Sequence, residues 1–366
     1  MRLDRIALRN WRNYEAETLS LDAETNVICG QNAQGKTNLL EAVYMLSVGR
    51  SFRTRTDREL ISFGADNAEI LAEVQSRERE QSIRLRLHAG VPKQISVNGV
   101  KKTAAELSDT LKVVLFCPDD LELIKDGAAV RRKLLDNAIS QIRPRYAELL
   151  ANYNKLYENK ARILKDWREK PSLLDTLDDF SDALCRTAAQ MIRYRASFTE
   201  RLNAAAAPIH SNFSGDGEKL RIEYQTVSTV TDPFAKASDI YYEICEHQEK
   251  HRQAELESGQ CLTGVHKDEL AIYINDQSAR AFASQGQTRT AALSIKLAER
   301  EIFLAESGEY PILLLDDVLS ELDTRRQEFV LNRIGGGQTL ISCCEDEGIS
   351  ERTGGKVLFV EKGKVR

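Results

Sequence analysis

Runs of apolar residues divide this 366-residue chain into three stretches. In about the first hundred residues, short alternating runs predict strands at Leu3–Leu8, Glu17–Leu21, Asn26–Cys29, Glu69–Gln75, Ser82–His88 and Gln94–Val97. After Pro118 the apolar period lengthens and predicts long helices over residues 144–167 and 180–207. Strands return at Leu270–Ile274, Ile312–Leu315, Thr339–Ser342 and Val357–Glu361, around helices at Thr290–Ala305 and Thr324–Ile334.

This order of elements predicts an α/β protein with an inserted, mostly helical lobe. A chain of this length exceeds one ordinary hydrophobic core, so we expect more than one globular unit. Residues 1–117 and 261–366 are expected to form one lobe with a mixed β-sheet and helices. Residues 118–260 are expected to form the helical lobe with a short arm.

A phosphate-binding loop follows the third expected strand. Residues 30–37 read GQNAQGKT and fit G-x-x-x-x-G-K-[ST], between a buried strand and an apolar helical pattern. In such a loop the glycines let the backbone approach a polyphosphate, Lys36 reaches the β and γ phosphates, and Thr37 binds Mg²⁺. The pattern predicts a nucleoside triphosphate site made by Gly30, Gln31, Asn32, Ala33, Gln34, Gly35, Lys36, Thr37 and Asn38.

A second motif, PILLLDDV, ends a buried strand in two carboxylates. Asp316 is the expected partner of Mg²⁺, and Asp317 is expected to orient or deprotonate the attacking water. A strand that ends in a solvated acidic turn is the simpler alternative. The 280 positions between Lys36 and Asp316 (316 minus 36) require a whole domain between the two halves of the site.

A third motif, SQGQ, precedes the expected helix at Thr290–Ala305. Ser284, Gly286 and Gln287 would present a hydroxyl, a flexible backbone and an amide at a helix N-terminus, which favours anions. Taken alone, these residues also fit an ordinary helix cap.

Composition limits the class of protein. The formal net charge is −5, but residues 124–170 carry twelve basic and six acidic side chains, and residues 50–102 are rich in arginine. Either zone fits a solvated helix face or a polyanion partner. The N-terminal residues lack the apolar run of a signal peptide, and no long uncharged apolar window follows, so we expect no membrane span and a cytoplasmic location. The seven cysteines show no metal-binding spacing and are expected to be buried thiols.

Four blocks of sequence together resemble the RecF family of bacterial recombination proteins, whose ATPase head is similar to those of SMC and Rad50. The blocks are LRNWRNYE, GQNAQGKTNLLEAVYMLSVGRSFR, PDDLELIKDGAAVRRKLLD and LLLDDVLSELD. The resemblance implies an ABC-type P-loop ATPase head that binds ATP and Mg²⁺ and hydrolyses ATP weakly in response to DNA. It also implies DNA repair at gapped or single- and double-stranded DNA, with RecO and RecR helping to load RecA, and roles in replication restart and the SOS response.

The resemblance also implies roles for particular residues. In an ATP-dependent homodimer, Ser284, Gly286 and Gln287 of one subunit would close on the phosphates held by the other. Lys36, Asp317, Ser284 and Gln287 would act in catalysis, and Arg12 and Asn13 would lie near the nucleotide. The basic residues expected to contact DNA are Arg53, Arg55, Arg131 and Arg132.

Some positions depart from the pattern of such heads. Transporter-type heads have a glutamate at the position of Asp317, whereas the RecF family, which this sequence resembles, generally has an aspartate there. The usual switch histidine is absent from LISCCED, and FCPDD stands at the usual Gln-loop position. GVHKDE only partly matches the family's run, and His266 fits a buried structural role better than a catalytic one.

Three other functions remain as alternatives. A transporter motor would have a Leu-Ser-Gly-Gly-Gln signature and a smaller helical insertion. A long-armed SMC-like tether is disfavoured because the expected helices are roughly 25 residues long and show no sustained heptads. A P-loop small-molecule phosphotransferase would need neither the SQGQ helix nor a response to DNA.

Overall fold

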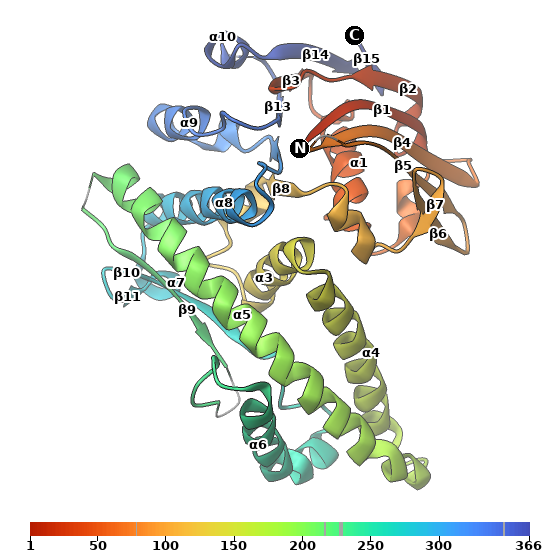
Figure 1. The fold of residues 1–366 in the computed structure, drawn as a ribbon, viewed down its shortest axis with the longest axis vertical. Helices are drawn as coiled ribbons and strands as arrows, with labels where there is room; N and C mark the ends of the chain where they lie inside the picture. Colours follow the sequence, from red (N-terminus) through yellow and green to blue (C-terminus); the bar gives the residue numbers. More distant parts are fainter. Residues whose placement is uncertain (78, 216, 227–229, 347) are drawn as a thin grey trace. The chain divides into compact units, whose positions relative to one another are not determined.

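The computed structural model describes residues 1–77, 79–215, 217–226, 230–346 and 348–366 (Figure 1). It forms two compact units. The first contains Met1–Glu122 and Ala292–Arg366, and the second contains Leu123–Ala291. Among the described helices, none combines the length and apolar character needed to cross a lipid bilayer.

The first unit contains an antiparallel sheet in the order β2-β1-β4-β5-β6-β7. Each predicted strand in this region is confirmed, and the observed strands extend one to three residues beyond most predicted ends. The run VNGV at residues 97–100, a sequence typical of a hairpin turn, joins β6 to β7 with positive φ at Asn98 and Gly99, the backbone that a two-residue hairpin turn favours. The strands are β1 (Arg2–Trp11), β2 (Tyr14–Ser20), β4 (Asn67–Ser76), β5 (Arg79–His88), β6 (Val91–Val97) and β7 (Val100–Lys102).

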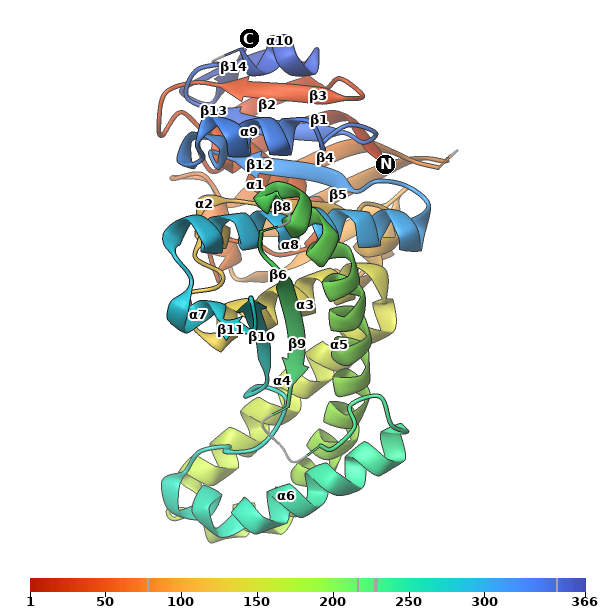
Figure 2. The ribbon, with the colours of Figure 1, turned by 90° about the vertical axis from the view of Figure 1, so that its left-hand side faces the viewer.

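The first unit also contains a mostly parallel sheet in the order β15-β14-β3-β13-β12-β8. Every residue of β3, β12 and β13 is buried, as expected for the central strands of a parallel sheet that is covered on both faces. Because these strands are parallel, their carboxyl ends meet at one edge of the sheet (Figure 2). The strands are β3 (Thr25–Cys29), β8 (Val113–Phe116), β12 (Ile312–Asp316), β13 (Thr339–Cys343), β14 (Lys356–Glu361) and β15 (Lys364–Val365).

Helix α1 (Lys36–Val48) places Leu39, Leu40, Val43 and Leu46 in the core of this unit, as the apolar spacing predicted. The other helices here are α2 (Pro118–Leu121), α9 (Thr324–Leu331) and α10 (Ile349–Thr353), with short 3₁₀ turns at Asp57–Leu60, Ala105–Asp109 and Leu319–Glu321. Helix α8 (Gln285–Ser307) begins in the second unit and continues into the first.

The second unit is mostly helical, with a small antiparallel sheet in the order β11-β10-β9. In Figure 2 the strands β9 and β10 run beside the upper part of α5, and α5 packs against β9. The elements are α3 (Ala128–Ile142), α4 (Pro144–Asp166), α5 (Leu177–Ser214), α6 (Ala237–Ser258), α7 (Ala279–Phe282), β9 (Leu220–Gln225), β10 (Glu269–Ile274) and β11 (Gln277–Ser278), with a 3₁₀ turn at Pro171–Thr176.

One helix is longer than its sequence predicts. The expected end at residue 207 was wrong, because α5 continues through Pro208 to Ser214 and has 38 residues. Proline removes one helical hydrogen bond, but Ala206, Ile209 and Phe213 are buried on one face of these last turns. Burial of this face offsets the local cost of the proline, so the estimate of roughly 25 residues holds for α4, with 23, and not for α5.

Candidate nucleotide-binding site

The loop between β3 and α1 requires glycine at two positions. Gly30 and Gly35 have φ of 157° and 123°, which L-residues rarely adopt. A Cβ atom at Gly30 would lie 2.4 Å from the Val360 carbonyl oxygen, and one at Gly35 would lie 2.8 Å from Asn13 Nδ2. The loop is therefore closely packed at both of its ends, while Gln31, Asn32 and Ala33 between them are exposed.

The start of α1 is arranged to receive an anion. The N-cap residue Gly35 has no side chain to bond the first-turn N–H groups, and among the described residues no side chain caps this helix end. Such N–H groups and the positive end of the helix dipole favour a phosphate. The Lys36 ammonium lies within the loop, where it donates to the Gly30 carbonyl oxygen at 2.7 Å and lies 3.9 Å from Asp317 Oδ2.

A chain of polar contacts joins α1 to the ends of β12 and β13. The Thr37 hydroxyl donates to Asp316 Oδ1 at 2.9 Å, and the Ser342 hydroxyl donates to the same oxygen at 2.8 Å. Ser342 Oγ also accepts from the Asp317 N–H at 2.9 Å. Burial raises the pKa of Asp316, and the hydrogen bonds from Ser342 and Thr37 oppose this rise. The structure thus brings the two motifs together despite their separation in sequence.

Ser342 belongs to this site and was not predicted as a functional residue. In the sequence, the run LISCCED stands out only because it lacks the usual switch histidine. A serine within a buried strand carries no motif, and its contact with Asp316 arises from the pairing of β12 with β13. This contact can be predicted only when the order of the strands in the sheet is known.

The residues at this edge fit a magnesium ion held with phosphates. Mg²⁺ prefers oxygen ligands and is commonly held by one or two protein groups, with phosphate and water oxygens completing its octahedron. Thr37 and Asp316 offer a hydroxyl and a carboxylate side by side. Within the described ranges there is no cluster of three or more His, Cys, Asp or Glu side chains that would bind a metal by itself. These two residues would therefore hold the ion only together with a triphosphate.

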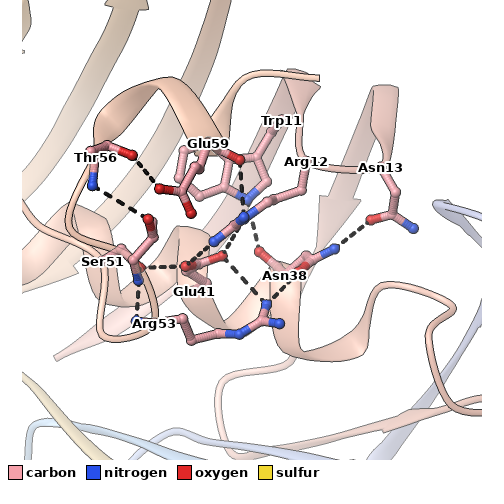
Figure 3. A network of polar contacts seen from close by, with 10 residues as sticks. Trp11, Arg12, Asn13, Asn38, Glu41, Ser51, Arg53, Thr56 and Glu59 are labelled. Carbon is pink, nitrogen blue, oxygen red and sulfur yellow. Dashed lines mark hydrogen bonds and ion pairs between the residues drawn. The ribbon is translucent and has the colours of Figure 1, made fainter. Parts of the chain in front are cut away.

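Arg12 and Asn13 lie beside α1 in a polar network (Figure 3). The Arg12 guanidinium binds both carboxylate oxygens of the buried Glu41 at 2.8 Å, and Asn13 Oδ1 accepts from Asn38 Nδ2 at 2.8 Å. Arg53, a predicted DNA contact, donates to Asn38 Oδ1 at 2.8 Å, and its side chain is 44% exposed. The network therefore links the start of α1 to two arginines.

An open cavity of about 790 Å³ lies against this network. Arg12, Asn13, Asn38 and Arg53 contribute to its wall, together with Phe63, whose side chain is fully exposed. An exposed aromatic ring among amides and arginines provides a surface for a planar base and for hydroxyl groups.

Ser284, Gly286 and Gln287 lie in the second unit, at the start of α8. The Ser284 N–H donates to Gln287 Oε1 at 2.8 Å, and the Gln287 N–H donates to Ser284 Oγ at 3.3 Å. These reciprocal bonds form a capping box. Gln287 Nε2 also donates to Glu218 Oε1 at 2.8 Å, while Ser284 is exposed. The structure therefore agrees with an ordinary helix cap at this turn. Because Ser284 is exposed, a second role for its hydroxyl can be tested.

The other predicted DNA contacts differ in exposure. Arg55 is exposed. Arg131 is buried, binds both carboxylate oxygens of Glu269 at 2.7 Å, and donates to the Leu123 and Asp126 carbonyl oxygens. Arg132 is half-buried and donates to the Asp268 carbonyl oxygen. The burial of Arg131 argues against the DNA contact expected of it and gives it a structural role.

His266 and Asp268 have structural surroundings in the second unit. His266 Nδ1 shares a hydrogen bond with the Tyr153 hydroxyl at 2.9 Å, and burial lowers the pKa of His266 to about 4. Asp268 is fully buried, accepts from the Tyr224 hydroxyl and lies 3.5 Å from the Arg195 guanidinium. A neutral histidine and a paired aspartate fit a stabilising network better than catalysis.

One part of the cysteine prediction was wrong. Four of the cysteines are buried and Cys117 and Cys245 are intermediate, but Cys344 is exposed. Cys344 follows the last residue of β13, so its side chain reaches the same edge of the sheet as the phosphate loop. Its thiol donates to Asn32 Oδ1 at 3.2 Å and lies 3.9 Å from Lys36 Nζ.

The chain is similar in sequence and in fold to known proteins. Residues 2–359 match the family model described as the RecF/RecN/SMC N terminal domain. A relative from Acetivibrio thermocellus, named DNA replication and repair protein RecF, is 36% identical over 98% of each chain. A relative of the same name from Listeria innocua is 39% identical over the full length of both chains. This chain belongs to the RecF family.

Solved structures agree with membership in the RecF family. A structure of the recombination mediator protein RecF-ATP in the RecFOR pathway is 34% identical and has a TM-score of 0.90, covering 100% of this chain and 96% of the other. The Smc head domain from Pyrococcus furiosus is 17% identical with a TM-score of 0.56, so it supports the fold alone. The prediction of an ABC-type ATPase head is confirmed.

Proposed function

We propose that this RecF-family protein is an ATP-driven switch that dimerises on DNA during recombinational repair. The supporting observation is the contact of Thr37 with Asp316, which joins the phosphate loop to the acidic strand at one edge of a parallel sheet. A triphosphate with Mg²⁺ is the ligand that fits a loop, a lysine, a hydroxyl and a carboxylate in this arrangement.

The residues of the site divide the work of binding and hydrolysis. The N–H groups at the start of α1 and the Lys36 ammonium bind the phosphates and stabilise the charge that develops on them. Thr37 and Asp316 would hold Mg²⁺, which would neutralise negative charge on the triphosphate. Asp317 accepts a hydrogen bond from the attacking water and orients it. The cavity lined by Arg12, Asn13 and Phe63 would accept the base and ribose.

The second part of the proposal concerns dimerisation. The Ser284 turn of one subunit closes on the triphosphate held by another, with Gly286 and Gln287 beside the γ phosphate. ATP then contacts both subunits only in the closed dimer, so binding favours closure and hydrolysis releases it. The exposure of Ser284 supports this role, because a hydroxyl that acts on another subunit must be accessible in the monomer.

The closed dimer would bind gapped or single- and double-stranded DNA, with the exposed Arg53 and Arg55 among its contacts. In this role it would act with RecO and RecR to load RecA, and so support replication restart and SOS induction in the cytoplasm. Family membership and the naming of a similar structure within the RecFOR pathway support this part of the proposal. Weak ATP hydrolysis stimulated by DNA would reset the switch.

A complementation experiment tests the trans arrangement. Lys36→Arg and Ser284→Arg proteins are each expected to lose DNA-stimulated ATPase activity, because one cannot hold the phosphates and the other cannot close on them. A mixed dimer contains one intact composite site. In an equimolar mixture about half of the dimers are mixed, and each has one intact site of two. Mixing is therefore expected to restore up to about a quarter of the wild-type activity, as measured by phosphate release with DNA present.

Two controls make this experiment decisive. Circular dichroism and subunit exchange must show that both variants fold and mix. If mixed dimers form and no activity returns, the trans role of Ser284 is contradicted. A phosphorylated small molecule formed without DNA would instead favour the phosphotransferase alternative.

A further inference from the structure

The turn between β14 and β15 contacts the phosphate loop directly. The Gly363 N–H donates to the Gln34 carbonyl oxygen at 3.0 Å, and the Lys362 N–H donates to Gln34 Oε1 at 2.7 Å. Both the main chain and the side chain of Gln34 are therefore held by a hairpin that lies more than 300 positions later in the chain. None of the sequence motifs includes this hairpin.

Gly363 is packed against Asn13, in the turn after β1, at a distance that excludes a side chain. Its φ is +71°, and a Cβ atom there would lie 2.2 Å from the Asn13 carbonyl oxygen. Asn13 Nδ2 in turn donates to the Gln34 carbonyl oxygen at 2.8 Å. The Gln34 carbonyl thus accepts from two segments, the turn after β1 and the turn after β14.

The same hairpin also borders the start of the loop. Gly30 approaches the Val360 carbonyl oxygen so closely that a Cβ atom would lie 2.4 Å from it. Val360 lies in β14, which pairs with β3 as a parallel neighbour. One hairpin therefore contacts both Gly30 and Gln34, the two ends of the exposed segment Gln31–Ala33.

We propose that the β14–β15 hairpin positions the phosphate loop through Gln34, so that Lys362 and Gly363 help to set the affinity for ATP. This inference rests on the proposed function, since it concerns the same triphosphate. A loop whose N–H groups are already aimed at the phosphates loses less conformational freedom on binding, and affinity rises accordingly. Lys362 and Gly363 are positioning residues and touch the loop rather than the ligand.

The test compares two glycines with the same backbone conformation. Gly363→Ala introduces a Cβ atom against Asn13, whereas Gly308→Ala introduces one at φ +72° with nothing within 4 Å. Both variants carry the same local strain, so their difference isolates the close packing against Asn13, through which Gly363 and Asn13 both hold the Gln34 carbonyl oxygen. Gly363→Ala is expected to raise the Kd for a fluorescent ATP analogue about tenfold, and Gly308→Ala about twofold or less.

A second variant covers the case in which Gly363→Ala does not fold. Gln34→Met keeps the length of the side chain and removes the acceptor for Lys362, so the Kd is expected to rise about threefold to tenfold. In Gly363→Ala the KM for ATP should rise while kcat at saturating ATP stays within about twofold of wild type.

The results separate this inference from the proposed function. If wild-type protein binds no ATP, the proposed function fails before the hairpin is tested. If wild type binds ATP and Gly363→Ala and Gln34→Met bind it as tightly as Gly308→Ala, the hairpin does not position the loop. A fall in thermal stability without a change in Kd would likewise assign the hairpin a purely structural role.

Discussion

Asp317 has both an uncommon backbone conformation and an uncommon side-chain environment. Its backbone φ is +50°, a conformation that asparagine and aspartate adopt more readily than other non-glycine residues. Its Oδ1 atom is buried and, among the described residues, has no hydrogen-bond partner. Unpaired buried oxygens are costly and are often found at functional sites. Both features agree with the proposed role of Asp317 as the acceptor for the attacking water.

We predict that Asp317→Asn separates ATP binding from hydrolysis. Asparagine tolerates the same φ and has the same shape, so folding and ATP affinity should change little. Hydrolysis should fall by about 100-fold or more, because a neutral amide accepts a hydrogen bond from the attacking water more weakly than a carboxylate does and can present its NH₂ group instead. Asp276→Asn is the matched control, since Asp276 also has positive φ, at 61°, and lies exposed in the second unit. Equal hydrolysis rates for wild type and Asp317→Asn would remove Asp317 from the mechanism.

Among the elements, α4 and α6 are joined by a buried ion pair. Lys160 Nζ lies 2.7 Å from Glu255 Oε2, and both side chains are almost fully buried. Glu255 also accepts from the Leu262 N–H at 2.8 Å, which holds the chain just after α6. A buried carboxylate that loses its cation keeps its desolvation cost, so removal of one partner is more damaging than the pair is stabilising.

We predict that Lys160→Met destabilises the second unit by about 3 kcal/mol, because Glu255 is left buried and unpaired. Urea denaturation monitored by circular dichroism measures this loss. Lys250→Met on α6 is the control, since Lys250 pairs with Glu246 at 2.6 Å on an exposed surface, and it should cost less than about 0.5 kcal/mol. Similar losses in the two variants would contradict the importance of burial.

Local sequence predicted the elements whose pattern is regular and could not predict those that depend on distant neighbours. The strands around the phosphate loop and the helix α1 have clear apolar periods and were confirmed. The run VVLF at β8 and the strand β9 were not predicted, because each is short and becomes a strand through pairing with β12 or β10. Helix α6 was also not predicted, since only Ile240 and Ile244 are buried apolar residues on it.

At the scale of the whole molecule, the candidate site depends on segments from both ends of the sequence. The motifs predicted Lys36, Thr37 and Asp316, and the first unit brings them together around one edge of its parallel sheet. Ser342 and Gly363 were not predicted. The position of Ser342 depends on the strand order, and that of Gly363 depends on the close approach of a hairpin. Ser284 lies in the second unit, and its action on another subunit stays a prediction.

We predict that Mg²⁺ and ATP slow amide hydrogen exchange in two steps. Amides of the phosphate loop and α1 should slow at any protein concentration, because the first unit alone holds the phosphates. Amides at the start of α8 should slow only at concentrations where dimers form, and not in Ser284→Arg. Hydrogen exchange with mass spectrometry measures both. Protection of the start of α8 in a protein shown to be monomeric would contradict the two-step order.

The position of β13 between β3 and β12 also constrains when the site can form during translation. Strand β3 emerges from the ribosome early, yet its neighbours on either side, β13 and β14, are synthesised only after the whole of Leu123–Ala291. The unit Leu123–Ala291 is continuous in sequence and can fold during translation, before β13 and β14 are synthesised. The phosphate loop therefore lacks its neighbouring strands until Thr339–Cys343 and β14 have been synthesised, and the nascent chain can form the ATP site only after that point.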